Sequence, residues 1–367
     1  MEFKTLFKRN ANGSINQWTI IVDAEGYWTE YGQVGGVITK SDKVYVNEKN
    51  VGRSNATNIS EQAIKEAKSI YDKKIKSDNC TPDINKIDEL VFQPPMLAQS
   101  YSGKFSESIK YIQPKLDGIR CNFSLFNGNI QAISRTNHPF FTVEHIKRVL
   151  QPILDEYPTL HFDGELYNHS LHDDFNKIVS LVKKEKISEE QRVEIESLVR
   201  YNIYDMWDDD NPNLTFSERN EIINNLCCNL EYIDIVNTFT IKNEEDVESY
   251  FTMFTNNKYE GAILRLDTPY EHKRSKNLLK YKKFDDAEFV ILDICEGKIR
   301  GHAEYAVIQL PNGNSCKATF SMTDEECVKV LKDKDNLIGK LGTVKYFGYT
   351  NDGKLRFPIF KAVRNYE

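Results

Sequence analysis

The sequence predicts an α+β protein built from three consecutive parts, residues 1–80, 93–284 and 285–367. In the middle part, short runs of β-favouring residues alternate with longer segments of helical periodicity. In the last part, closely spaced strand-like runs follow one another with turn residues between them. Ahead of both, a small module ends in a mostly polar connector, residues 77–82, which closes with proline. These three observations set the predicted organisation.

The first part combines short strands with one helix. Residues 18–22 and 43–46 read as strands, glycines suited to turns lie between them, and residues 60–76 favour a helix. We expect a small α+β module here, separate from the rest of the chain.

The middle part is predicted to form an α+β core. Its strand-like runs are residues 130–134, 161–166, 201–205 and 261–266. Its helical segments are residues 143–150, 216–226 and 244–254.

The last part is predicted to be a small β-barrel. Its strand-like runs are residues 288–292, 305–310, 316–320 and 342–347. The segment Pro311-Asn312-Gly313-Asn314 supplies a tight turn between two of them. Short strands at this spacing suit a closed barrel.

Composition excludes membrane and fibrous proteins. The chain of 367 residues is 40% hydrophobic and 28% charged, and no apolar run approaches the ~20 residues that a membrane-spanning helix needs. The start, Met1-Glu2-Phe3-Lys4, is polar and lacks a signal-peptide core. We expect an intracellular protein, cytoplasmic or at the genome, which is monomeric and has no membrane partner.

Cysteine usage and charge narrow the function classes further. The seven cysteines are scattered without a Cys-x-x-Cys pair, so we expect reduced and mostly buried thiols and no zinc site. A net charge of −7 argues against non-specific coating of nucleic acid. Locally, the basic residues of 272–276 and 280–283 could line a groove that holds phosphates or form a solvated surface.

The most informative motif is Pro114-Lys115-Leu116-Asp117-Gly118-Ile119-Arg120. A lysine amine can attack phosphorus and capture a nucleotide when it is unprotonated. Gly118 would allow the backbone to approach a phosphate or sugar closely. Taken alone, the motif more often marks a strand that ends in an Asp-Gly turn. No Gly-x-x-x-x-Gly-Lys-Ser/Thr loop is present, so any ATP site must be of another kind.

Further motifs follow in a fixed order, and their order is more specific than any one of them. They are Phe162-Asp163-Gly164-Glu165-Leu166, Tyr201-Asn202-Ile203-Tyr204-Asp205, Tyr259-Glu260-Gly261-Ala262-Ile263-Leu264-Arg265, Leu278-Leu279-Lys280-Tyr281-Lys282-Lys283-Phe284 and the terminal 355–364 cluster. This series closely resembles the motifs of the ATP-dependent DNA ligases, which belong to the covalent nucleotidyltransferases. The resemblance covers about residues 93–367. It implies a nucleotidyltransferase (adenylation) core followed by an OB-fold barrel.

The resemblance also implies the reaction. Lys115 attacks the α-phosphate of ATP, pyrophosphate leaves, and a lysyl-AMP forms. The AMP then moves to the 5′-phosphate of a nick in duplex DNA, where the 3′-hydroxyl displaces it. Each step places negative charge on phosphorus oxygens. We therefore expect cations and a divalent metal at the site, with Mg²⁺ as the metal or Mn²⁺ as its substitute.

The resemblance assigns the nucleotide site to residues of the inner motifs. Lys280 and Lys282 are implied at the α-phosphate, and their two-residue spacing puts both on one face of a strand. Tyr204 aligns with the aromatic residue that stacks on adenine. Glu165 resembles the residue that binds the ribose. Glu260 resembles the residue that holds the metal, and Glu165 is implied as a second metal ligand. Outside the family, each of these side chains would be an ordinary surface or core residue.

Other residues are implied to contact DNA or pyrophosphate. Arg120 and Arg135 match arginines that grip the 5′-phosphate of the nick, and Asp117 would act near the metal or the 3′ side. The terminal motif would orient pyrophosphate through Arg356, Lys361 and Arg364. The Tyr31-Gly32-Gln33-Val34-Gly35-Gly36 segment loosely resembles a WGR-like module, in which DNA contact is suspected; a purely stabilising role is the alternative.

One residue departs from the family pattern. Many members carry glutamate two positions before the lysine, where it reads the adenine amino group, and this chain has Gln113. Its amide can still accept that hydrogen bond, but the charge that would enforce a strict ATP preference is missing.

Two other functions fit parts of the same pattern. An RNA ligase or capping-type guanylyltransferase shares the lysine chemistry, although Arg120 and the terminal Arg-Phe-Pro cluster favour a DNA ligase. A non-catalytic nucleic-acid-binding protein on a degenerate core is disfavoured, since all five implied catalytic lysines and glutamates are present, Lys115, Glu165, Glu260, Lys280 and Lys282.

Overall fold

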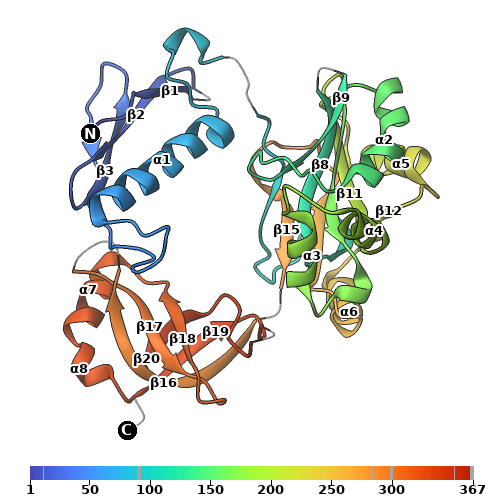
Figure 1. Ribbon diagram of the computed structural model, residues 1–367. Coiled ribbons are helices and arrows are strands. Elements are labelled where there is room, and N and C mark those ends of the chain that lie inside the picture. Colours follow the sequence, from blue (N-terminus) through green and yellow to red (C-terminus); the bar gives the residue numbers. More distant parts are fainter. Residues whose placement is uncertain are drawn as a thin grey trace. The chain divides into compact units, whose positions relative to one another are not determined.

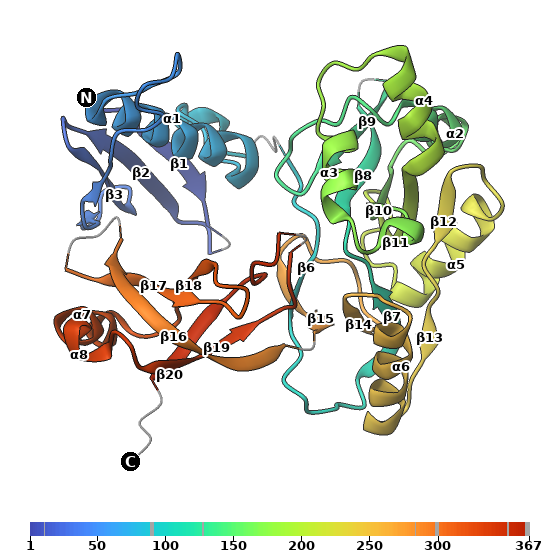
Figure 2. The ribbon, with the colours of Figure 1, turned by 60° about the horizontal axis from the view of Figure 1, so that its bottom comes forward.

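The computed structural model describes residues 1–10, 12–88, 92–126, 128–282, 284–297, 301–350 and 352–363. The chain divides into two compact units, one formed by Phe92–Lys282 and the other by Met1–Val91 together with Lys283–Glu367. Figures 1 and 2 show their elements.

The N-terminal segment is one antiparallel sheet covered by one helix (Figure 1). The strands are β1 (Leu6–Arg9), β2 (Ile15–Val22), β3 (Gly26–Gln33), β4 (Thr39–Lys40) and β5 (Val44–Tyr45). Helix α1 (Ile59–Asp78) packs against β2 and β3 and buries its small residues Ala63 and Ala67 there. The predicted helix at residues 60–76 is thus confirmed. Its capping box pairs Asn58 with Glu61, so the helix begins at Ile59, one residue before the predicted start.

This segment extends past residue 80. The backbone of Thr81 exchanges two hydrogen bonds with Phe7, and Arg9 forms a bidentate ion pair with Asp88 beyond the short 3₁₀ helix η1 (Ile84–Lys86).

The unit Phe92–Lys282 contains two five-stranded sheets. The first has the order β12-β11-β10-β8-β9, with strands Ile233–Ile235, Arg200–Asp208, Leu160–Tyr167, Ile119–Phe126 and Asn129–Ser134. The second has the order β13-β7-β14-β15-β6, with strands Phe239–Thr240, Ile109–Lys115, Gly261–Leu266, Arg274–Tyr281 and Leu97–Ser100. β7 and β8 are consecutive in the chain but belong to different sheets, so the Lys-x-Asp-Gly-x-Arg motif crosses from one sheet to the other.

Helices cover both sheets. The helices of this unit are α2 (Glu144–Glu156), the 3₁₀ helix η2 (His169–Leu171), α3 (Phe175–Val182), α4 (Glu189–Leu198), α5 (Phe216–Cys227) and α6 (Glu244–Asn256). α2 and α5 pack on the first sheet, and α6 packs on β7 and β14 of the second. Each sheet has its own buried apolar cluster. The helices predicted at residues 143–150, 216–226 and 244–254 are confirmed as α2, α5 and α6.

The C-terminal segment is a closed barrel in the order β16-β17-β18-β20-β19. Its strands are Asp285–Glu296, Ala303–Gln309, Ser315–Phe320, Ile359–Val363 and Leu341–Tyr346. Helices α7 (Asp324–Lys332) and α8 (Lys334–Leu337) lie between β18 and β19 in the chain. The prediction of a small barrel is confirmed. β20 and α7 were not predicted, although Thr323 and Glu326 form a capping box that the sequence displays.

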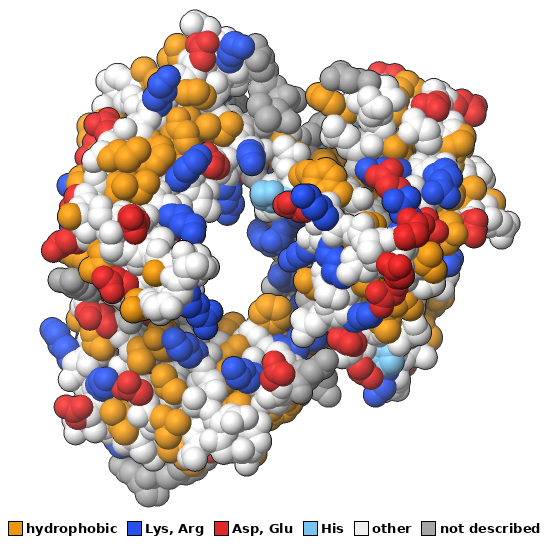
Figure 3. Space-filling view, in the orientation of Figure 1, with side chains coloured by type: hydrophobic (Ala, Val, Ile, Leu, Met, Phe, Trp, Pro, Cys, Tyr) orange, Lys and Arg blue, Asp and Glu red, His pale blue; other side chains and the backbone are white. Residues whose placement is uncertain are grey.

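In the described ranges, no helix is long and apolar enough to cross a membrane. All seven cysteines are free; Cys80, Cys121, Cys227 and Cys327 are buried, and Cys228 is exposed. In Figure 3, Lys and Arg side chains are interspersed with Asp and Glu over the visible face of each unit.

Candidate active site

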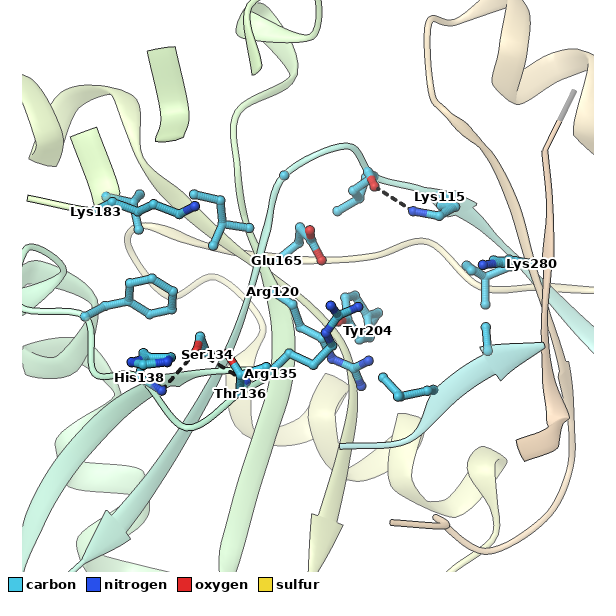
Figure 4. Close-up of a pocket in the computed structure, with 18 of the residues that line it drawn as sticks. Lys115, Arg120, Ser134, Arg135, Thr136, His138, Glu165, Lys183, Tyr204 and Lys280 are labelled. Carbon is cyan, nitrogen blue, oxygen red and sulfur yellow. Dashed lines mark hydrogen bonds between the residues drawn. The ribbon is translucent and has the colours of Figure 1, made fainter. Parts of the chain in front are cut away.

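A cavity of about 1020 Å³ lies within the unit Phe92–Lys282 and takes its lining from both sheets. Eight of the residues predicted for the site line it, namely Gln113, Lys115, Arg120, Arg135, Glu165, Tyr204, Lys280 and Lys282. Figure 4 shows most of them around the cavity. Asp117 and Glu260 are not among the lining residues. Arg356 and Lys361 belong to the barrel segment, and Arg364 lies outside the described residues.

Lys115 is the last residue of β7, and Glu260 precedes the first residue of the neighbouring strand β14. Antiparallel pairing sets Gly261 opposite Lys115, and the Glu260 N–H donates to the Lys115 carbonyl at 3.0 Å. The carboxylate of Glu260 then forms ion pairs with the amines of both Lys115 and Lys282. Lys115 also donates to the Leu116 carbonyl at 3.3 Å. The predicted nucleophile and two predicted partners therefore meet in one ion-pair chain.

Burial and the two lysines act in opposite directions on Glu260. Its side chain is 3% exposed, and burial is the largest influence and raises its pKa. The positive charges of Lys115 and Lys282, together with their hydrogen bonds, outweigh burial and leave the pKa below its usual value. Glu260 is therefore a carboxylate.

The two other lysines are depressed in pKa. Burial lowers the pKa of Lys280 most, followed by the like charges of Arg274 and Lys115. Burial also lowers the pKa of Lys282, and Lys115 adds to it. Lys280 lies in β15, whereas Lys282 follows its last residue, Tyr281, so the structure does not place both lysines on one strand. The site thus concentrates positive charge that an anion would relieve.

Glu165 lies in β10, opposite Arg120 of β8 and Asn202 of β11. Burial raises its pKa to about 7, although Lys115 and Arg120 act to lower it. Among the described residues, its carboxyl group accepts no hydrogen bond and forms no ion pair at 4 Å or less, so it is available to a ligand.

Gly118 packs so closely against Glu165 and Leu166 that there is no space for a side chain. A Cβ at Gly118 would lie 2.5 Å from the Leu166 carbonyl oxygen and 2.7 Å from Cγ of Glu165. The close approach that the glycine permits is therefore between β10 and the turn after β7. The expectation that it serves a phosphate or sugar has no support in these contacts.

Tyr204 of β11 is flanked by two guanidinium groups. Those of Arg120 and Arg265 lie 5.7 and 5.9 Å from its ring centroid. Burial raises the pKa of its hydroxyl well above the usual value. The ring is half-buried and lines the cavity.

Gln113 is buried, and its amide is engaged by the protein. The amide NH₂ donates to the Tyr204 carbonyl at 3.2 Å and to the Thr238 hydroxyl at 2.9 Å, while its oxygen accepts from Nε of Arg265 at 2.7 Å. The amide oxygen keeps one further lone pair.

Asp205, the last residue of the Tyr201–Asp205 motif, lies behind this wall, and the sequence indicated no role for it. It accepts from Nε of Arg219 at 2.8 Å and pairs with Arg265. Arg219 on α5 gave no sequence signal. This buried network fixes Arg265, and through it Gln113 and Tyr204.

Arg120 is held mainly by the protein. Its guanidinium forms a bidentate pair with Asp163 and also donates to the Met96 carbonyl at 2.8 Å and the Tyr270 hydroxyl at 3.3 Å. These bonds use four of its five N–H groups. Arg135, in contrast, lies exposed in the turn after β9 and lines the cavity.

The cavity includes further cations that received no specific role from the sequence. These are Lys183, Lys184 and Arg274, with His138 beside them. Arg274 belongs to the basic stretch noted in the sequence; the others carried no recognisable pattern. Within the described ranges, no group of three or more His, Cys, Asp or Glu is arranged to hold a metal ion.

Comparison with known proteins identifies the domains. The ATP dependent DNA ligase domain family matches residues 95–282, and the DNA ligase OB-like domain family matches residues 296–364. The DNA ligase of African swine fever virus (isolate Pig/Kenya/KEN-50/1950) is 28% identical over 298 residues, which cover 76% of this chain and 67% of the viral protein. The DNA ligase of Haemophilus influenzae is 26% identical over 277 residues, 72% of this chain and 90% of the relative.

Solved structures agree in fold. A chain from a structure-function analysis of Lig E DNA ligases superposes with a TM-score of 0.59 at 24% identity, covering 74% of this chain and all of the other. The structure Pmar-Lig_Pre superposes with a TM-score of 0.65 at 18% identity, covering 84% and 73%. The predicted fold class, a nucleotidyltransferase core followed by an OB-fold barrel, is confirmed. With its adenylation and OB-like domains in the family's order, the chain belongs to the ATP-dependent DNA ligases.

Proposed function

We propose that this protein uses ATP to seal nicks with a 5′-phosphate and a 3′-hydroxyl in duplex DNA, through a lysyl-AMP and a DNA-adenylate. The observation that carries the proposal is the chain of ion pairs Lys115–Glu260–Lys282 at a cationic cavity. The family of the matched domain favours this function over RNA ligation or capping.

In the first step, Nζ of Lys115 attacks the α-phosphorus, an N–P bond forms, and the P–O bond to pyrophosphate breaks. Lys280 and Lys282 would neutralise the charge that develops on the phosphate oxygens. Both lie close enough to Lys115 to be depressed in pKa by its charge. In the later steps the same cations would stabilise AMP while it moves to the DNA 5′-phosphate.

The nucleoside would lie against the wall formed by Tyr204, Glu165 and Gln113. Tyr204 presents a ring for the base to stack on. Glu165 has a carboxyl group without a hydrogen-bond partner among the described residues, and it can accept hydrogen bonds from ribose hydroxyls. Gln113 keeps one lone pair for the adenine amino group, a neutral contact weaker than that of a carboxylate.

Glu165 and Glu260 would hold a divalent cation together with phosphate oxygens. Each carboxylate disfavours the other, since the charge of Glu260 contributes to raising the pKa of Glu165. A hard cation bound at this site would relieve that repulsion, and Mg²⁺ or Mn²⁺ binds such oxygens while keeping several waters. The ion would supply charge stabilisation at the α-phosphate.

The remaining predicted contacts concern DNA and pyrophosphate. Arg135 would meet the 5′-phosphate of the nick, assisted by the N–H group of Arg120 that forms no hydrogen bond to a described residue. Asp117 would act near the metal or the 3′ side. We propose that the terminal motif orients pyrophosphate through Arg356, Lys361 and Arg364.

The domain assignment follows the same reasoning. We propose that residues 93–284 form the adenylation domain, residues 285–367 the OB-fold domain, and residues 1–80, with the contacts of Thr81 and Asp88 that extend them, a WGR-like accessory module that contacts DNA. The protein would act as a monomer on nicked duplex DNA inside the cell.

Incubation with α-labelled ATP and Mg²⁺, followed by a denaturing gel, tests the proposal. The full chain should acquire an acid-labile, base-stable label, and Lys115→Ala should remove it while Lys110→Ala, an exposed lysine of the same strand, should not. A label that persists in Lys115→Ala excludes this lysine as the nucleophile, and preference for GTP would favour capping chemistry.

A further inference from the structure

The cavity has cations at two separated places. Figure 4 shows Lys115 and Lys280 on one side and Lys183 on the other, with Glu165 and Arg120 between them in this view. The proposed lysyl-AMP chemistry uses the Lys115 side. It assigns no role to Lys183 and Lys184, which line the same cavity.

The loop that carries these lysines is fixed next to the Arg135 turn. The Thr142 hydroxyl, which is buried, donates to the Val182 carbonyl at 3.0 Å and so ties the end of α3 to the segment that follows β9. Within that segment, the Ser134 N–H donates to the His138 carbonyl at 2.8 Å, and the His138 N–H donates back to the Ser134 hydroxyl at 3.0 Å. Arg135 and Lys183 therefore lie on two backbone segments that a hydrogen bond connects.

Their charges are only partly balanced by nearby carboxylates. Among the described residues, neither Lys183 nor Lys184 nor Arg135 forms a salt bridge at 4 Å or less, although the charge of Lys184 helps to lower the pKa of Glu194. The acidic lining residue at this end is Glu185. Cations that face a cavity without a salt-bridge partner favour a phosphate-bearing ligand.

Resting on the proposed function, we propose that Lys183 and Lys184, together with Arg135, form a second phosphate subsite that binds the sugar-phosphate backbone of the strand carrying the nick 5′-phosphate. Arg135 contacts the terminal phosphate, and the two lysines contact phosphodiesters that follow it in that strand. Phe141, which is 54% exposed at the cavity rim, adds an apolar surface for a sugar or base. A triphosphate tail has the same chemistry, but the predicted pyrophosphate contacts belong to the barrel segment, so we assign the subsite to DNA.

A structural role for the same lysines makes a different prediction. Lys183 caps the C-terminus of α3, where its N–H donates to the Val179 carbonyl at 3.1 Å and its charge favours the helix dipole. In that case, replacing the lysines would lower the melting temperature and leave DNA binding unchanged.

The test compares Lys183→Ala/Lys184→Ala with Lys110→Ala/Lys186→Ala in the full chain. The control removes the same charge from exposed lysines outside the cavity. Three quantities are measured: lysyl-AMP formation from ATP, affinity for a nick that already carries AMP, and the dependence of that affinity on salt. We expect unchanged lysyl-AMP formation, about tenfold weaker binding and a salt slope smaller by about 2 for the cavity variant alone. Lys183→Arg/Lys184→Arg should retain binding.

Neutral methylphosphonates, placed one at a time at phosphodiesters next to the nick phosphate, identify the contact. At the contacted position, wild type and the alanine variant should bind equally, because the interaction is already lost. If the cavity variant loses lysyl-AMP formation as much as DNA affinity, the lysines contact the triphosphate. If the control variant loses as much DNA affinity as the cavity variant, the effect comes from net charge alone. Either result overturns the subsite. If the wild-type chain fails to form lysyl-AMP at all, the proposed function itself is wrong.

Discussion

Glu260 is joined to Lys115 twice, by an ion pair between the side chains and by the hydrogen bond from its N–H to the lysine carbonyl at 3.0 Å. The second side-chain oxygen of Glu260 pairs with Lys282. One buried carboxylate therefore holds both lysines at the mouth of the proposed α-phosphate site. Its position depends on the antiparallel register of β7 and β14 and not on a flexible loop.

Replacing the Glu260 carboxylate by an amide should slow the formation of lysyl-AMP. Glu260→Gln keeps the side-chain size but leaves Lys115 and Lys282 without a counter-charge, so we expect lysyl-AMP formation to fall on the order of a hundredfold. Single-turnover labelling with ATP measures the rate. Glu248→Gln, an exposed residue that accepts from the Tyr281 hydroxyl at 2.9 Å, is the matched control and should behave as wild type. Full activity of Glu260→Gln would contradict its role in the site.

Glu165 should make stability depend on pH. Its pKa in the folded protein is about 7 against an ordinary value of 4.5, so the folded state holds this proton more tightly than the unfolded state. The stability that it contributes is complete below pH 4.5 and is lost as pH rises through 7. Because each pH unit between these values is worth ~1.4 kcal/mol, the loss is at most about 3 kcal/mol.

Glu165→Gln stays neutral and should escape this loss. We expect the variant and wild type to melt at similar temperatures at pH 4.5 and the variant to be more stable at pH 8. Thermal melts across this range measure the difference. Curves that stay parallel at all pH values would show that Glu165 has an ordinary pKa.

The two arginines proposed for the 5′-phosphate should differ in their effect on folding. Arg120→Ala leaves Asp163, which is 1% exposed, without its bidentate partner, and removing one member of a buried pair costs ~3–5 kcal/mol. Arg135→Ala removes an exposed side chain, so its stability should stay within ~0.5 kcal/mol of wild type while sealing falls. Denaturant unfolding of both variants checks this. An Arg120→Ala protein as stable as wild type would assign that guanidinium to DNA alone.

Gly118 should tolerate no side chain. In Gly118→Ala the new Cβ would lie 2.5 Å from the Leu166 carbonyl oxygen, so β10 or the turn after β7 must move. We expect a lower melting temperature together with reduced lysyl-AMP formation, because Glu165 and Lys115 flank the displaced backbone. Gly36→Ala, whose Cβ would meet its nearest atom at 3.4 Å, is the control. Normal melting of Gly118→Ala would show that the backbone there yields easily.

The predicted site residues that line one cavity lie within β-strands or directly at their ends. Lys115 ends β7, Lys280 lies in β15, and Glu165 and Tyr204 lie in neighbouring strands. The order of the motifs was sufficient to identify these residues, because strand pairing brings such positions together.

Helix α7 shows a local signal that the sequence analysis missed, since Thr323 and Glu326 have the spacing of a capping box.

Long-range partners could not be read from the sequence. Arg120 pairs with Asp163 across 43 positions, and Gln113 is bonded by Arg265 across 152. Both contacts depend on how β-strands from different motifs pack, which no local pattern encodes. The same holds for Lys183, whose place depends on the hydrogen bond between Thr142 and Val182.

The ladder between β7 and β14 also has a consequence for how activity is lost. Its last backbone bond, between Glu260 and Lys115, lies at the end of the strand pair, where fraying costs less free energy than opening the middle of a sheet. Opening this one end would separate the nucleophile from its carboxylate while both sheets remain folded. Mild heating or low denaturant should therefore inactivate the protein reversibly before its global transition. Amide exchange at Glu260 should be faster than at Leu264, which sits farther along the same ladder.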